Sequence, residues 1–400
     1  MKSPLRLETL AVHAGAEADR ETGAVAPPIH LATTFRHGPA AERVAGYEYQ
    51  REGNPTQDRL ETALAALEGG EAALAYASGM AAISGLLETL PAGARILVPD
   101  DCYSGLRYLA TEFLPQRGIE CAFVDMADPA AVEAACEPRP AVVWVETPSN
   151  PLLKLTDIAA MARIAHAHDA LLVCDNTFAT PVLQQPLALG ADVVMHSTTK
   201  YFGGHSDVLG GALVFARRDG AFDTARHRRH VTGPVLAPFS AWLLLRGCRS
   251  LAARMAMHCS NARRLAEFLE GNPAIAQVNW PGLPAHPGHD VATAQMKDYG
   301  AMLSVRLRGG RDAATRRRRC VSPADRRPAR RCSTGPGSTR ASSACRGRPA
   351  CRTRCRPSWE SRSGWRRPGT HRSTCSSRPP GRARSGATCW CHAGVTGPAR

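Results

Sequence analysis

Residues 170–207 read ALLVCDNTFATPVLQQPLALGADVVMHSTTKYFGGHSD, and this stretch decides the fold. Its two apolar runs, 170–174 and 192–195, have the length and composition of buried strands. Polar residues follow each run directly: Asp175 ends the first, and 196–201 (HSTTKY) follow the second. Ligands of a mostly parallel sheet bind at the carboxyl ends of its strands. We therefore expect these polar residues to lie at the binding edge of a sheet.

Predicted strands alternate with predicted helices through the first three-quarters of the chain. This alternation is typical of an α/β fold with a mostly parallel sheet. Strands are predicted at 72–76, 95–98, 120–124, 141–145, 170–174, 192–195 and 211–215, and helices at 58–67, 78–90, 105–114, 129–136 and 157–168.

Three elements at the predicted sheet edge suit a phosphorylated pyridine cofactor. Residues 78–80 (SGM) stand where a strand turns into a helix, so their N–H groups and the helix dipole favour a phosphate. Ser197 and Thr199 are two apart, so both hydroxyls could face one phosphate. Asp175 could hold a protonated pyridine nitrogen, and Lys200 follows an apolar strand in a chain with only four Lys. We expect Lys200 to be buried, because burial lowers an amine's pKa and suits it to imine formation.

Each of these residues also has a purely structural interpretation. A glycine at a strand–helix turn serves the backbone, an Asp after a strand caps a helix, and an isolated Lys is a solvated surface charge. Their combination, in this order, favours the cofactor interpretation.

Five runs carry a resemblance to a known family: 49–56 (YQREGNPT), 78–80 (SGM), 146–151 (ETPSNP), 175–179 (DNTFA) and 197–207 (STTKYFGGHSD). With 234–247 and 258–310, they make residues 5–310 resemble the Cys/Met-metabolism family of pyridoxal 5′-phosphate (PLP) enzymes, the cystathionine γ-synthase and γ-lyase group. The resemblance implies a fold-type I transferase: a large domain with a mostly parallel sheet and a smaller C-terminal α/β domain.

The resemblance implies roles around the cofactor ring. Lys200 would hold PLP as a Schiff base and move protons at the substrate's Cα and Cβ. Asp175 would pair with the pyridine nitrogen. Tyr103 would stack on the ring and act in acid–base steps, and Asn150 would lie near the phenolic oxygen or the substrate carboxylate.

The resemblance also implies how the phosphate is held. Gly79 and Met80 would donate backbone N–H groups, and Ser197 and Thr199 would donate hydroxyls.

The last implied contribution comes from a second copy of the chain. Tyr49 and Arg51 would reach the phosphate of the neighbouring subunit, which makes the active site a shared one. An obligate dimer is expected, usually paired into a tetramer.

The primary functional prediction is γ-replacement, in which cysteine adds to an O-acylhomoserine and gives cystathionine. Cystathionine γ-lyase activity, direct sulfhydrylation of O-acylhomoserine and β-elimination remain alternatives, since the same machinery supports them. Residues 103–105 (YSG) carry no Cys after the tyrosine, which counts against a methionine γ-lyase-like enzyme.

Charge divides the chain near residue 310. The formal net charge of +15 hides a tail, 311–400, with 23 Arg, no Lys and three acids, so residues 1–310 carry a net charge of −5. The predicted organisation is an N-terminal arm (1–55), a PLP-binding large domain (56–250), the start of the C-terminal domain (251–310) and this tail.

The tail contains no Leu, Ile, Phe or Met, so it is expected to be disordered. Its Arg, Pro, Ser, Gly and Cys are typical of GC-rich codons read out of frame, and our hypothesis is a frameshift near 313–316. The alternative of another class is a cofactor-binding protein whose Arg-rich tail binds nucleic acid; the absence of interleaved aromatic or Lys residues argues against it. The family's carboxylate-binding Arg has no counterpart after Gly310, so poor solubility and low turnover are expected.

The remaining composition predicts a cytoplasmic protein. Six Cys are scattered singly through residues 1–310, as expected for free buried thiols in a reducing compartment. The N-terminus lacks the apolar run of a signal peptide, and no stretch reaches the length of a membrane helix. The His residues lack metal-ligand spacing, so no metal site is predicted.

Overall fold

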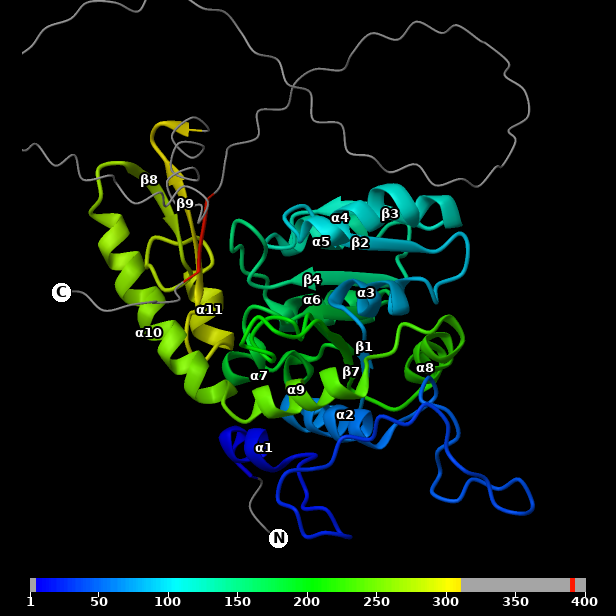
Figure 1. The fold of residues 1–400 in the computed structure, drawn as a ribbon. Coiled ribbons are helices and arrows are strands. Elements are labelled where there is room, and N and C mark those ends of the chain that lie inside the picture. The colour runs from blue at the N-terminus through cyan, green and yellow to red at the C-terminus, as the bar shows by residue number, and fades with distance from the viewer. Residues whose placement is uncertain (1–4, 311–388, 393–400) are drawn as a thin grey trace, which may run out of the picture. The chain divides into compact units, whose positions relative to one another are not determined.

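The computed structural model describes residues 5–310 and 389–392 (Figure 1). The helices are α1 (Leu7–His13), α2 (Pro55–Glu68), α3 (Gly79–Leu87), α4 (Ser104–Tyr108), α5 (Pro129–Ala135), α6 (Ile158–Ala167), α7 (Thr180–Leu183), α8 (Gly220–Thr232), α9 (Pro238–Cys248), α10 (Leu251–Glu270) and α11 (His289–Gln295). Shorter helical turns are η1 (Leu109–Phe113), η2 (Pro115–Arg117) and η3 (Pro186–Leu189). The strands are β1 (Ala72–Tyr76), β2 (Arg95–Pro99), β3 (Glu120–Val124), β4 (Val142–Glu146), β5 (Leu171–Asp175), β6 (Val193–His196), β7 (Gly211–Phe215), β8 (Ile275–Asn279), β9 (Met302–Leu307) and β10 (Cys389–His392).

The larger sheet has seven strands in the order β1-β7-β6-β5-β4-β2-β3. Strand β7 is antiparallel to β1 and β6, and all other neighbours are parallel. All seven strands predicted from the sequence are present, each within one residue of its predicted bounds. The predicted α/β fold with a mostly parallel sheet is therefore confirmed.

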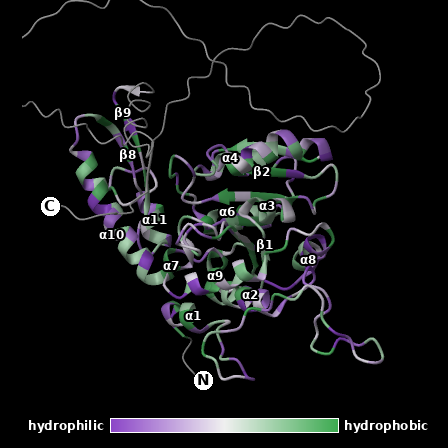
Figure 2. Cartoon of the chain, viewed as in Figure 1, coloured by the Kyte–Doolittle hydropathy of each residue, from purple (hydrophilic) through white to green (hydrophobic). Residues whose placement is uncertain are grey.

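Helices cover both faces of this sheet, and the alternation of side chains along each strand explains why. In β7, Ala212 and Val214 pack into the core beneath α2, α9 and α10, whereas Leu213 and Phe215 pack into the core beneath α3 and α4. Strands buried on both faces read as continuous apolar runs, which Figure 2 shows as green strands inside a more polar exterior.

The chain then leaves the large sheet through the long helix α10. Residues after it form a second sheet, in which β9 pairs antiparallel with β8 and with β10. A separate core around Trp280 and Leu303 joins this sheet to the second half of α10. The predicted change of domain at residue 250 falls at the start of α10, between α9 and this second core.

The predicted disorder of 311–400, the frameshift near 313–316 and the nucleic-acid-binding tail concern residues that lie almost entirely outside the described part. Within that tail the structure describes only residues 389–392, which form strand β10.

Two smaller expectations can be compared with residues 5–310. The six cysteines of this region are free, and five of them are buried. No helix of this region is both long and apolar enough to cross a membrane.

Candidate active site

The carboxyl ends of β4, β5 and β6 meet at one edge of the large sheet, as the sequence predicts. They carry Glu146, Asp175 and His196. Glu146 and Asp175 occupy paired positions on adjacent parallel strands, and the Asn176 N–H donates to the carbonyl of Met195 (3.0 Å). Glu146 and Asp175 therefore point to the same face of the sheet, whereas His196, one residue beyond the partner of Asp175, points to the other face.

Asp175 is tied to the loop after β6 through Thr177. Asp175 Oδ1 accepts the backbone N–H of Thr177 at 2.9 Å, and the Thr177 hydroxyl also bonds to this carboxylate. The same hydroxyl oxygen accepts the N–H of Ser197 at 2.9 Å. Thr177 thus fixes Asp175 and Ser197 relative to each other, a role that its place in the sequence does not reveal.

Burial raises the pKa of Asp175, while the Thr177 hydrogen bonds and the nearby His196 act in the opposite direction. His196 Nε2 lies 2.6 Å from Glu68 Oε1, and both side chains are buried. Asn176 Nδ2 donates to the same Glu68 oxygen at 2.8 Å. No pattern in the sequence predicts a role for Glu68 or His196.

The N-terminus of α3 lies directly against Ser197. A Cβ placed on Gly79 would lie 2.9 Å from Ser197 Cβ and 3.0 Å from its Oγ. Ser78 caps the helix by accepting the Ala81 N–H at 3.0 Å. The N–H groups of Gly79 and Met80 have no acceptor inside the helix, because the first turn of any helix lacks one. Gly79, Met80 and Ser197 therefore come together as predicted.

Thr199 and Lys200 lie in the turn that follows. The Thr199 hydroxyl donates to the carbonyl oxygen of Gly210 and accepts its N–H, both at 3.0 Å. Lys200 is exposed in the single chain, so the expectation that it is buried is wrong at this level. The neighbouring Thr198, Tyr201 and Phe202 are buried, so the exposure is that of the Lys200 side chain and not of the whole turn.

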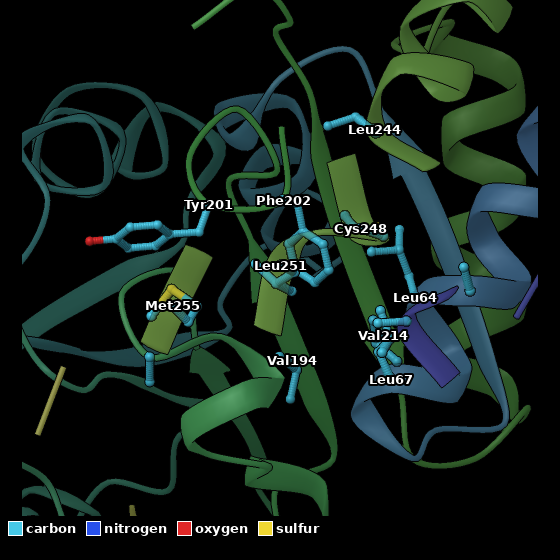
Figure 3. Close-up of a cluster of buried hydrophobic side chains, with 14 of the residues drawn as sticks. Leu64, Leu67, Val194, Tyr201, Phe202, Val214, Leu244, Cys248, Leu251 and Met255 are labelled. Carbon is cyan, nitrogen blue, oxygen red and sulfur yellow. The ribbon is translucent and has the colours of Figure 1, made fainter. Parts of the chain in front are cut away.

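The backbone after Lys200 is nevertheless firmly anchored. Tyr201 and Phe202 are buried in the core with Leu251 and Met255 of α10, as Figure 3 shows. Arg254 Nη1 donates to the Tyr201 carbonyl at 2.5 Å, and Arg254 Nη2 donates to the Gly247 carbonyl at 2.7 Å.

Gly204 leaves room for this arginine. Its φ is +73°, and a Cβ there would lie 2.3 Å from Arg254 Nη1. Only glycine suits this left-handed turn and close approach. Nothing in the sequence pattern points to Arg254.

Tyr103 precedes α4, with its side chain 43% exposed. A Cβ on Gly105 would lie 2.5 Å from the Tyr103 ring and 2.6 Å from Met80 Sδ, so the ring and the Met80 side chain both lie close to Gly105. Glu146 Oε2 accepts the Tyr103 N–H at 2.8 Å, and the Asn150 N–H donates to the same carboxyl group. The structure thus connects Tyr103 and Asn150 to the end of β4.

Tyr49 and Arg51 form a separate pair. The Arg51 guanidinium lies 5.3 Å from the Tyr49 ring centroid and donates to the His230 carbonyl at 2.5 Å. Among residues 5–310, no hydrogen bond or ring contact joins either residue to Lys200 or Asp175 of the same chain.

The residues at this edge fit PLP. The partly buried Asp175 carboxyl group suits a protonated pyridine nitrogen, because a cation offsets the cost of ionising it. The space beside Gly79, which a Cβ would fill, together with the first N–H groups of α3, suits a phosphate.

Comparisons with known proteins agree with this geometry. The family described as Cys/Met metabolism PLP-dependent enzyme matches residues 8–322. The chain is 47% identical to a cystathionine gamma-synthase of Mycobacterium bovis over 308 residues, 76% of this chain and 79% of that protein. It is 44% identical to a cystathionine gamma-lyase of Bacillus subtilis over 300 residues, 75% and 79% of the two chains. A cystathionine beta-lyase of Lactococcus lactis is also 44% identical, over 301 residues, with the same coverage.

Solved structures give the same result. The crystal structure of metB from Corynebacterium glutamicum matches with a TM-score of 0.76 and 44% identity, over 78% of this chain and 81% of that one. The cystathionine gamma synthase of Xanthomonas oryzae pv. oryzae, solved with aminoacrylate and cysteine, matches with a TM-score of 0.75 and 42% identity, with the same coverage.

Proposed function

Because this chain belongs to the Cys/Met metabolism PLP-dependent enzyme family, and so is a PLP-dependent trans-sulfuration enzyme, we propose that it catalyses γ-replacement. The cysteine sulfur replaces the acyloxy group of an O-acylhomoserine: the Cγ–O bond breaks, a Cγ–S bond forms, and the products are cystathionine and a carboxylic acid. The observation that carries this choice is the 47% identity to a gamma-synthase over 308 residues. The alternatives are cystathionine γ-lyase activity, supported by 44% identity to a gamma-lyase, and O-acylhomoserine sulfhydrylase activity.

The cofactor-facing roles are part of the proposal. When bound, PLP supplies an electron sink for negative charge at the substrate's Cα. Asp175 holds the proton-bearing pyridine nitrogen, whose positive charge would oppose the burial that raises the pKa of this carboxyl group; Thr177 and His196 act in the same lowering direction. Lys200 binds the cofactor covalently through Nζ. When substrate releases it, Lys200 moves protons at the Cα and Cβ atoms of the substrate.

The phosphate is proposed to lie at the start of α3. Gly79 and Met80 donate backbone N–H groups, and the Ser197 hydroxyl lies beside Gly79. Thr199 joins them through its hydroxyl, whose present partner is the Gly210 backbone.

The ring and the substrate are proposed to be held from the β4 side. Tyr103 stacks on the ring and acts near the leaving group, and Asn150 lies near the phenolic oxygen or the substrate carboxylate. The shared backbone link of both residues to Glu146 supports placing them in one site.

A second subunit completes the site in this proposal. Tyr49 and Arg51 have their contacts elsewhere in their own chain, and Lys200 is exposed. Both observations support a dimer, or a pair of dimers, in which Tyr49 and Arg51 reach the neighbouring phosphate.

We also propose that residues 311–400 are a frameshift product that supplies no carboxylate-binding arginine. The family match ends at residue 322, which supports this. Resequencing the locus tests it: an unbroken reading frame through 313–316 would refute it.

The activity is tested by steady-state kinetics on the chain and on a frame-restored version. Cystathionine formation from O-succinylhomoserine or O-acetylhomoserine with cysteine is compared with breakdown of cystathionine and with sulfide incorporation. Faster turnover of cystathionine than of either acylhomoserine would refute γ-replacement as the main reaction. Lys200→Ala serves as the inactive reference.

A further inference from the structure

Glu146 is a buried acid with no part in the reaction proposed above. It is the last residue of β4, and it is only 6% exposed. Buried carboxyl groups are costly unless their hydrogen bonds and charge are accommodated. The contacts of this side chain therefore indicate why it lies there.

Those contacts lead to three of the predicted site residues. Glu146 Oε2 accepts the Tyr103 N–H at 2.8 Å, and the Asn150 N–H donates to the same carboxyl group. On the neighbouring strand, Asp175 occupies the position paired with Glu146. One side chain thus links the residue before α4, the loop after β4 and the end of β5.

The link to Tyr103 is mechanically important. Tyr103 is 43% exposed, with Gly105 and Met80 beside its ring. Its backbone N–H bond to Glu146 ties Tyr103 directly to β4, and Asp101 adds bonds from the Ser149 hydroxyl and the Leu152 N–H.

We propose that Glu146 is a positioning residue of the active site, which holds Tyr103 and Asn150 at a fixed distance from Asp175 through hydrogen bonds from their backbone N–H groups. This inference rests on the proposed function, because Tyr103, Asn150 and Asp175 have their cofactor roles only there.

The ionisation state of Glu146 determines which substitution should preserve its hydrogen bonds. Burial raises its pKa well above the ordinary value, and the nearby Asp175 and Asp101 raise it further, against the N–H bonds that lower it. These influences together favour the protonated form of the carboxyl group. A glutamine has the same shape, one oxygen acceptor and no charge, so Glu146→Gln should preserve the positioning, whereas Glu146→Ala should abolish it.

The test is a PLP titration of the full 400-residue chain as wild type, Glu146→Gln, Glu146→Ala and the control Val145→Ala. Val145 is the preceding residue of β4, and it is buried in the core on the other face of the sheet. PLP affinity, visible circular dichroism per bound cofactor and the thermal midpoint are measured. Induced dichroism reports how the ring is held against its surroundings, so general destabilisation does not reproduce a change in it.

We expect Glu146→Gln to stay within about threefold of the wild-type Kd, and Glu146→Ala to weaken PLP binding by about tenfold, the effect of one or two lost hydrogen bonds. At saturating PLP, Glu146→Ala should lose about half or more of the dichroism, while Val145→Ala should lower the thermal midpoint and keep the dichroism, as a core cavity does.

Two results would overturn the inference: wild-type affinity and dichroism in Glu146→Ala, or equal damage in Glu146→Gln and Glu146→Ala. Failure of the proposed function looks different. In that case the wild-type chain itself binds no PLP, or its visible absorbance persists in Lys200→Ala.

Discussion

Replacing Arg254 of α10 should loosen the turn that carries Lys200. The guanidinium donates to the Tyr201 carbonyl (2.5 Å), the Gly247 carbonyl (2.7 Å) and the Ser250 hydroxyl (3.0 Å). It thereby joins α10, the end of α9 and the residue that follows Lys200. Arg254→Met keeps the stem of the side chain and removes all three bonds.

The magnitude follows from the two carbonyl bonds. A hydrogen bond from a charged donor contributes about 1.5–3 kcal/mol when buried, and water replaces part of it at a half-buried side chain such as this one. We therefore expect a total loss of about 2–4 kcal/mol, which lowers the thermal midpoint of a protein of this size by about 4–8 °C. PLP affinity should fall as well, because the Lys200 backbone loses its fixed position.

Differential scanning fluorimetry and PLP titration measure the two effects. Arg264→Met is the matched control, since Arg264 lies on the same helix and is exposed. Arg254→Lys should fall between wild type and Arg254→Met, because an ammonium group cannot reach both carbonyls in the same way. A midpoint for Arg254→Met that matches that of Arg264→Met would refute the reasoning.

Further outcomes are expected. Gly79→Ala should weaken PLP binding by about tenfold, since its methyl group would lie 2.9 Å from Ser197 Cβ; Gly220→Ala, at the start of α8 with open space around it, should have no effect on titration. Mixing Arg51→Ala with Lys200→Ala subunits of the frame-restored protein should regain activity that neither variant has alone, because a mixed dimer contains one site with both native residues. If activity does not recover, Arg51 acts in the same subunit as its Lys200. In the PLP-free chain, the raised pKa of Glu146 contributes stability that is present below its ordinary pKa and is lost as pH rises toward the folded-state value. As pH rises above the ordinary carboxyl pKa, the thermal midpoint should therefore shift in favour of Glu146→Gln, and a pH-independent difference would contradict the raised pKa of Glu146. Restoring the frame should raise turnover and solubility, and equal turnover of the two chains would refute a missing substrate-binding part.

The sequence was most informative where a local pattern carries the information. The strands of the large sheet are continuous apolar runs, and burial on both faces makes such runs easy to recognise. Asp175 and the 197–200 segment stood out because polar residues directly follow those runs. Arg254 and Thr177 carry no such signal; Glu146 does directly follow the predicted strand 141–145, but its bond to Tyr103 cannot be read from that position. Their importance arises from contacts with residues distant in the chain, as the bond between Glu146 and the Tyr103 N–H illustrates.

Lys200 marks the boundary between the two kinds of information. Its place after a buried strand is a property of the sequence, but its exposure depends on what covers the turn, and one chain leaves it open. The sequence alone therefore determined the elements, their order and the polar residues at the strand ends, because each depends on neighbours along the chain. The tertiary structure decided that β4, β5 and β6 lie side by side and that Glu146 and Asp175 occupy paired positions. Strand order and the electrostatics of a buried edge both depend on long-range pairing, which no local pattern encodes.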